Sequence, residues 1–157
     1  MKDLEKTSEE HFGLKCIAIA AKLEFQERNT PHHHILLWLE GGVLEDVDVI
    51  DSIIKAELPR GNSERQKELK KLVKKFNIYR HSPYCKGRSG DGRCRFGYDE
   101  NVVTPSTTID EITNRVVYRR RHREDLRLMT YNHYLTMKYK ADIDVERTQA
   151  GSALAYP

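Results

Sequence analysis

The sequence has 157 residues, which is enough for one domain with an ordinary hydrophobic core. It is 38% hydrophobic and 32% charged, so we expect a globular chain with an unusually polar surface. No stretch approaches the roughly 20 consecutive apolar residues of a membrane span, so a membrane partner is not expected. The net charge of +3 is too small to indicate a partner by itself.

The cysteine count and the chain ends bear on the compartment. Three cysteines, an odd number, argue against a disulfide framework and for a reducing, intracellular compartment. The opening MKDLEKTSEE is charged rather than apolar, so no secretory signal is expected. The last segment, TQAGSALAYP, stops abruptly among small residues, and we expect the chain to be a piece of a longer protein.

The first predicted elements are two strands that form an antiparallel hairpin. Apolar and β-branched residues alternate in part over Leu14–Gln26, and HHHILLWLE reads as a second strand with Trp38 in the core. Asn29 and Pro31 are the turn formers between them. Gly41 and the glycine after it end the second strand.

Two helices should follow, and then a loop-rich half. LEDVDVIDSIIKAELP has apolar residues at helical spacing and ends near Pro59. A second helix is expected from Asn62, because Ser63 and Gln66 have capping-box spacing. Beyond a loop over residues 80–111, RVVYRR predicts a strand and NHYLTMKYK a short helix or an extended connection. Strands, then helices, then strand again favour an α+β fold over a βαβ series.

The histidine run suggests a metal site on the hairpin. Side chains alternate along a strand, so His32 and His34 face the same way and His33 faces the other way. Glu24 and Gln26 share one face of the preceding strand and would lie beside them. Nitrogen and oxygen ligands with open positions suit Mg²⁺ or Mn²⁺ in phosphoryl chemistry, although imidazole also suits Zn²⁺. Hydrogen-bonded strand-end histidines are the simpler alternative.

Three ordered segments resemble one family. EFQERNTPHHHILLWLE is similar to the EFQ-K-R-G-x-P-H-x-H-I-L-L-W-L segment of the replication-initiator-like domain of Helitron transposases, a branch of the HUH endonucleases. HSPYCKGRSGDGRCRFGY and YRRRHREDLRLMTYNHYLTMKYKADIDVE resemble later segments of that domain in the same order. The resemblance spans residues 12–146. It implies a Rep-like fold, with an antiparallel sheet of about five strands flanked by helices.

The resemblance also implies an activity. Residues 1–157 would form a single endonuclease domain of a larger nuclear transposase that carries a covalently linked helicase. Its partner would be single-stranded DNA at transposon ends, nicked by a tyrosine that stays joined to the 5′ phosphate. The family has two tyrosines four residues apart at this point, whereas only Tyr156 follows the matching segment here. The chain would then end near the helix that carries the nucleophile.

A cysteine-containing loop is a second candidate metal site. The family often carries His-x-His-x-x-x-Cys and a second Cys before Arg-Phe, which looks like a structural zinc site. Here Tyr79 replaces the first histidine, so that His81, Cys85 and Cys94 remain where a closed zinc site wants four ligands. His11 or His122 could complete the set, and two free cysteines in a loop are the alternative.

Two basic runs are candidate DNA contacts. Arginine guanidinium groups bind phosphates and stack on unpaired bases, and the lysine-rich second helix could add electrostatic attraction. The candidate residues are Arg119, Arg120, Arg121, Arg123, Lys71 and Lys75. Ordinary solvated surface is the alternative for both runs. For the whole chain, the alternatives to a nicking enzyme are a non-catalytic, zinc-stabilised nucleic-acid-binding module and a catalytically dead Helitron relative.

Overall fold

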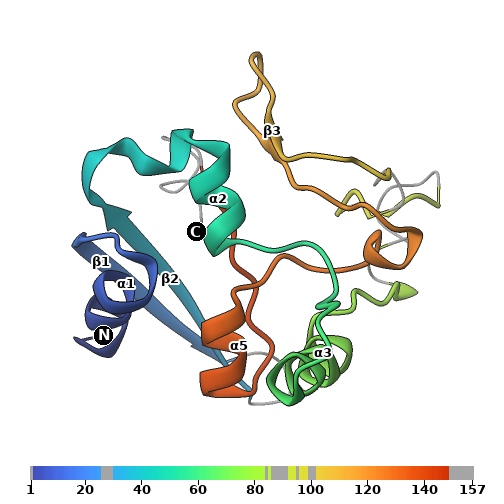
Figure 1. Ribbon diagram of the computed structural model, residues 1–157, viewed down its shortest axis with the longest axis horizontal. Coiled ribbons are helices and arrows are strands. Elements are labelled where there is room, and N and C mark those ends of the chain that lie inside the picture. The colour runs from blue at the N-terminus through green and yellow to red at the C-terminus, as the bar shows by residue number, and fades with distance from the viewer. Residues whose placement is uncertain are drawn as a thin grey trace. The chain divides into compact units, whose positions relative to one another are not determined.

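The computed structural model describes residues 2–25, 30–83, 85, 92–94, 96–98 and 102–148 (Figure 1). The chain divides into two compact units, the first reaching to Val49 and including Thr148, the second spanning Ile50–Arg147. Among the described residues no helix is both long and apolar enough to cross a membrane.

The first unit consists of a helix and a long hairpin. Helix α1 (Lys2–Phe12) precedes strand β1 (Cys16–Phe25), which pairs antiparallel with β2 (Pro31–Leu39). A 3₁₀ helix, η1 (Glu40–Glu45), follows, and then α2 (Val47–Ile53) begins. A backbone hydrogen bond of 2.9 Å from Glu40 N to Lys15 O closes the open end of the hairpin. The strand pair confirms the predicted hairpin.

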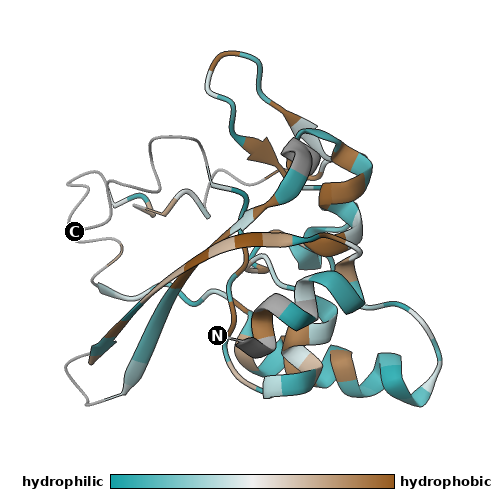
Figure 2. Cartoon of the chain, turned by 90° about the vertical axis from the view of Figure 1, so that its left-hand side faces the viewer, coloured by the Kyte–Doolittle hydropathy of each residue, from teal (hydrophilic) through white to brown (hydrophobic). Residues whose placement is uncertain are grey.

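The hairpin strands are apolar over much of their length (Figure 2). Large apolar side chains alternate with smaller or polar ones along β1, whereas β2 has a continuous apolar run from Ile35 to Leu39. Several of these apolar residues are exposed: Ile17, Leu23, Phe25, Ile35 and Trp38. The prediction that Trp38 lies in the core is wrong, because 42% of the residue is exposed. A two-stranded ribbon has no second layer of its own to cover either face.

The second unit holds the hydrophobic core. Its elements are the end of α2, α3 (Glu64–Phe76), β3 (Thr108–Ile109), β4 (Val116–Val117), the 3₁₀ helix η2 (Arg123–Asp125) and α5 (His133–Tyr139). The core packs one face of α3 against the segments before it and before α5, through Leu58, Leu69, Val73, Leu128 and Tyr131. The fully buried Tyr131 donates its hydroxyl proton to Glu57 O at 2.8 Å, so the largest core side chain keeps a polar partner.

Local capping explains where both helices of this unit begin. Ser63 is extended and its hydroxyl accepts the Gln66 N–H at 3.3 Å, as its sequence spacing predicts. Asn132 caps α5 by accepting the Leu135 N–H at 2.9 Å. The other end of the Asn132 amide donates to Ile53 O at 2.7 Å, so this cap also holds α5 to the end of α2.

The α+β class is confirmed, but the five-stranded sheet is not found in the described part of the chain. The strands there form two separate ribbons, β1–β2 and β3–β4. The predicted strand RVVYRR pairs over only two residues, because Arg120 leaves the ladder and makes an isolated bridge with Thr104. The five strands and the Rep-like sheet were implied by the resemblance, and the described strands form two-stranded ribbons instead.

Candidate metal sites and nucleic-acid surface

Strand register gathers the hairpin candidates on one face. Glu24 pairs directly with His32, and Lys22 pairs with His34. The His32 and His34 ring centroids lie 4.6 Å apart, and His34 Nε2 lies 3.4 Å from Glu24 Oε2. The predicted juxtaposition of two imidazoles and a carboxylate is therefore present. His33, one position along the pleat, belongs to the opposite face.

The Glu24 carboxylate is held in its ionised form. Lys22 Nζ lies 2.7 Å from Glu24 Oε1, and this hydrogen bond and charge, with a smaller contribution from His34, lower the pKa of Glu24. An ionised carboxylate beside two imidazoles is a chemically sound set of ligands for a divalent cation. The side chains of His34 and Glu24 are 38% and 40% exposed, which leaves room for solvent or a phosphate. Gln26, the other predicted ligand from this strand, lies outside the described residues.

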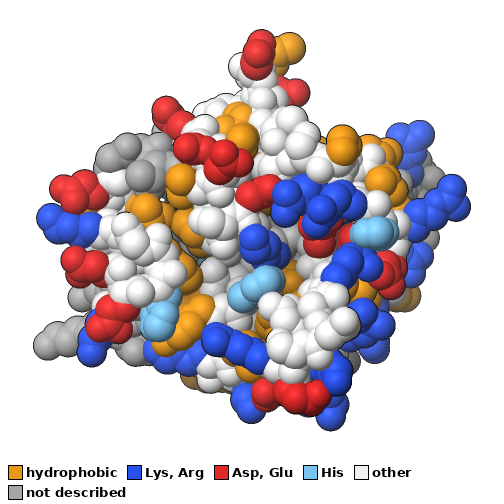
Figure 3. All heavy atoms as spheres, viewed as in Figure 1, with side chains coloured by type: hydrophobic (Ala, Val, Ile, Leu, Met, Phe, Trp, Pro, Cys, Tyr) orange, Lys and Arg blue, Asp and Glu red, His pale blue; other side chains and the backbone are white. Residues whose placement is uncertain are grey.

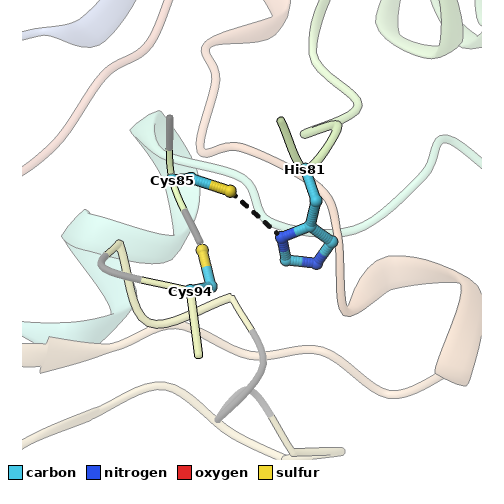
Figure 4. Close-up of side chains that lie close together, drawn as sticks. All are labelled: His81, Cys85 and Cys94. Atoms are coloured by element: carbon cyan, nitrogen blue, oxygen red, sulfur yellow. Dashed lines mark hydrogen bonds between the residues drawn. The ribbon is translucent and has the colours of Figure 1, made fainter. Parts of the chain in front are cut away.

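The cysteine loop brings its three predicted ligands, His81, Cys85 and Cys94, together in a compact group. The ligand atoms of His81, Cys85 and Cys94 all lie within 4.8 Å of one another, the only such three-residue group in the described part of the chain. Figure 4 shows the three side chains converging, with His81 Nδ1 3.6 Å from Cys85 Sγ. Both cysteines are buried, and neither forms a disulfide. The group includes neither His11 nor His122.

Aromatic rings frame this cluster. Tyr79 stacks on Tyr98 with ring centroids 3.9 Å apart and 8° between planes, and it meets His81 and Phe96 edge-on. The Cys94 thiol hydrogen-bonds to the Tyr79 hydroxyl at 3.4 Å. Burial by itself raises the pKa of Cys94, but hydrogen bonds from Tyr79 and from backbone N–H groups bring it below its usual value. A thiol that ionises readily is suited to bind a soft or borderline metal ion.

The arginine run makes internal contacts. Arg119 pairs with Asp51 at 3.1 Å and with Glu57 at 3.2 Å, and Arg121 forms two hydrogen bonds to the Glu57 carboxylate at 2.7 and 2.8 Å. Arg120 is buried, and its guanidinium donates to the carbonyl oxygens of Tyr118 and Leu128. The predicted role of Arg120 in DNA binding is inconsistent with this position, because a phosphate cannot reach the buried group.

The lysines and the last arginine of the run are better placed for a nucleic acid. Lys71, Lys75 and Arg123 are exposed, and Lys75 Nζ lies 4.7 Å from the Phe76 ring centroid. Figure 3 shows basic side chains gathered over the region of α3, interrupted by acidic ones. The Lys67 ammonium on the same helix is paired with Glu64 at 2.7 Å.

Sequence reasoning missed the acidic partners of the arginines and a half-buried histidine, His133. Asp51 and Glu57 stand 62 or more residues before the arginines they bind, so no local pattern announces them. Burial, and to a smaller degree Lys55 and Arg65, lower the pKa of His133 to about 4. Tyr156, the predicted nucleophile, lies outside the described residues.

The comparisons with known proteins identify no relative of this chain. No protein-family model, no curated protein and no solved structure matches the chain.

Proposed function

We propose that this chain is the single-stranded DNA nicking and strand-transfer domain of a Helitron-like rolling-circle transposase, dependent on Mg²⁺ or Mn²⁺. The observation that carries the proposal is the shared face of His32, His34 and Glu24 on the hairpin. The same segment supports the resemblance to the HUH endonucleases. The hairpin holds the three side chains together by strand register alone, so a larger sheet is not needed to position them.

The ligands would be one neutral nitrogen each from His32 and His34 and an oxygen from Glu24. A cation bound there would supply charge stabilisation and orientation for a DNA phosphate. The partial exposure of His34 and Glu24 gives that phosphate access from solvent. Lys71, Lys75 and Arg123, in the second unit, would add contacts of their own to the DNA backbone.

Tyr156 is the proposed nucleophile of the strand cleavage. Its phenol oxygen would form a bond to the scissile phosphorus while the bond from phosphorus to the 3′ oxygen breaks. The phenol proton would pass to solvent, and the departing 3′ oxygen would take a proton from solvent and leave as a hydroxyl. Phenolate leaves more readily than an alkoxide, so the phosphotyrosine link can be reversed for strand transfer. The 5′ phosphate end remains attached to the protein, which allows rejoining to a second DNA end.

A nicking assay with a matched histidine control tests the proposal. The chain is incubated with single-stranded DNA and Mn²⁺, and covalent adducts are resolved on a denaturing gel. The wild type and His33→Ala should nick, because His33 lies on the opposite face. The double variant His32→Ala, His34→Ala should lose nicking and Mn²⁺ binding together. Equal nicking by that double variant would overturn the assignment.

A zinc-stabilised nucleic-acid-binding module is the second candidate, and the His81, Cys85 and Cys94 cluster favours it. On this proposal the zinc ion orders a loop and the chain binds DNA without cutting it. Stoichiometric zinc that is lost in Cys85→Ser, together with DNA binding but no adduct in the nicking assay, would select this function. A dead relative of the nuclease would give the same assay result with Mn²⁺ still bound at the hairpin.

A further inference from the structure

The cysteine cluster supplies three ligands, whereas a closed tetrahedral zinc site has four. In the described part of the chain, no further histidine, cysteine, aspartate or glutamate joins the group. The fourth position is therefore open to a different kind of ligand. The side-chain oxygen that hydrogen-bonds to the group is the phenol hydroxyl of Tyr79, 3.4 Å from Cys94 Sγ.

The spacing of these atoms matches the edges of a zinc tetrahedron. Zinc–sulfur bonds of about 2.3 Å and zinc–nitrogen or zinc–oxygen bonds near 2.0 Å give tetrahedral edges of about 3.5–3.6 Å between sulfur and nitrogen or oxygen. The His81 Nδ1 to Cys85 Sγ distance is 3.6 Å, and the Cys94 Sγ to Tyr79 hydroxyl distance is 3.4 Å. Two opposite edges of the tetrahedron, His81–Cys85 and Cys94–Tyr79, therefore already have about the required length.

The Tyr79 ring is fixed in this orientation by its own packing. It stacks on Tyr98 with 8° between the ring planes and contacts the edges of His81 and Phe96. These contacts involve the ring, while the hydroxyl makes its hydrogen bond with Cys94 Sγ. The hydroxyl would therefore enter a coordination shell with little reorganisation of the side chain.

We propose that Tyr79 is the fourth ligand of a Zn²⁺ site formed with His81, Cys85 and Cys94. The inference rests on the zinc-binding loop of the second candidate function. Binding would form one bond from zinc to each of two thiolate sulfurs, one imidazole nitrogen and one phenolate oxygen. The protons of the two thiols and of the phenol pass to the buffer, so no oxidant or reductant is required.

Two phenylalanine variants separate the hydroxyl from the ring. Tyr79→Phe removes the proposed ligand and keeps the ring packing, whereas Tyr98→Phe removes a neighbouring hydroxyl and serves as the matched control. Each purified chain is titrated with Zn²⁺, with stoichiometry from native mass spectrometry and affinity from competition with a chelator. The near-ultraviolet difference spectrum reports formation of tyrosinate. Tyr79→His supplies a nitrogen ligand at the same position.

We expect the wild type and Tyr98→Phe to bind one zinc ion per chain and to show the tyrosinate band. Tyr79→Phe should lose the band and bind zinc about tenfold more weakly or worse, while Tyr79→His should bind tightly without the band. Zinc binding of equal affinity in Tyr79→Phe, or a wild-type complex without the band, would overturn the role of Tyr79 and leave the loop site standing. Failure of the wild type to bind zinc would overturn the loop site itself.

Discussion

The Asp125 carboxylate accepts two hydrogen bonds from the guanidinium of Arg60, at 3.2 and 2.9 Å, across 65 residues of sequence. Asp125 is fully buried, and the same Oδ1 accepts the Leu58 N–H at 2.9 Å. The Arg60 guanidinium also reaches Glu124 at 2.7 Å. This one carboxylate therefore joins η2 to the segment between α2 and α3, beside the core residue Leu58.

Removing the Asp125 side chain should destabilise the protein strongly. Asp125→Ala leaves the Leu58 N–H buried without its partner and leaves Arg60 paired with Glu124 alone, which we expect to cost about 2–4 kcal/mol of unfolding free energy. Asp125→Asn keeps an oxygen for Leu58 and should cost less. Urea denaturation of both variants measures the difference, and equal losses would contradict the importance of the Leu58 hydrogen bond.

Stability should fall as the pH drops below the ordinary pKa of histidine, because of His133. Burial lowers the pKa of His133 from 6.5 to about 4 in the folded chain, so the unfolded chain takes up its proton first. Between pH 6.5 and pH 4 this should remove about 2 kcal/mol, after allowance for partial solvent exposure. The free energy of unfolding, measured by denaturation at several pH values in this range, should depend less on pH for His133→Gln than for the wild type. Parallel curves for the two proteins would rule out His133 as the source.

A second loss of stability, at lower pH, should come from protonation of Glu57. Burial alone would raise the pKa of Glu57, but the hydrogen bonds and charges of Arg121 and Arg119 lower it from 4.5 to about 2. The stabilisation is complete above pH 4.5 and is lost as the pH falls toward 2. We expect a contribution of about 1–2 kcal/mol, because Arg121 is half exposed. Glu57→Gln should reduce acid sensitivity in this lower range only, as followed by circular dichroism.

Lys71 and Lys75 should contribute to DNA affinity without sequence preference. Each lysine that contacts a phosphate of a single strand steepens the dependence of log K on log salt by about 0.7, so the double change to glutamine should reduce the slope by about 1.4. Affinity for unrelated single-stranded oligonucleotides should fall to a similar degree. Lys67→Gln is the control, because Lys67 is already paired with Glu64. An equal effect of Lys67→Gln would point to general charge loss instead of a defined surface.

Local patterns predicted the parts of this chain that local forces determine. Alternation gave the hairpin and the shared face of His32 and His34, and the Ser63 capping box fixed the start of α3. Helix α1 escaped notice because its sequence, KDLEKTSEEHF, is dominated by charge and carries few apolar residues. Strand β4 lies in the predicted RVVYRR strand, whereas β3 falls in the predicted loop over residues 80–111, because two residues are too short to show a period.

Contacts between distant segments could not be read from the sequence. The arginine run suggested a surface for phosphates. Arg119 and Arg121 instead pair with Asp51 and Glu57, and Arg120 is buried. A basic run shows only where charge is available, whereas its partners are set by tertiary packing. The cluster of His81, Cys85 and Cys94 was predicted from the resemblance, because the family carries ligands at the same spacing. The hydrogen bond between the Tyr79 hydroxyl and Cys94 could be seen only in the structure.

The direct pairing of Glu24 with His32 has a consequence for how this protein can vary. A slip of the two strands by a single residue would place His33 opposite Glu24 and send the imidazole pair to the other side of the ribbon. Substitutions in the connection from Phe25 to Pro31 should therefore be tolerated more readily than an odd-numbered insertion or deletion. Natural variants that keep the shared face of His32, His34 and Glu24 are expected to differ in the residues of this connection, and to change its length only by an even number of residues.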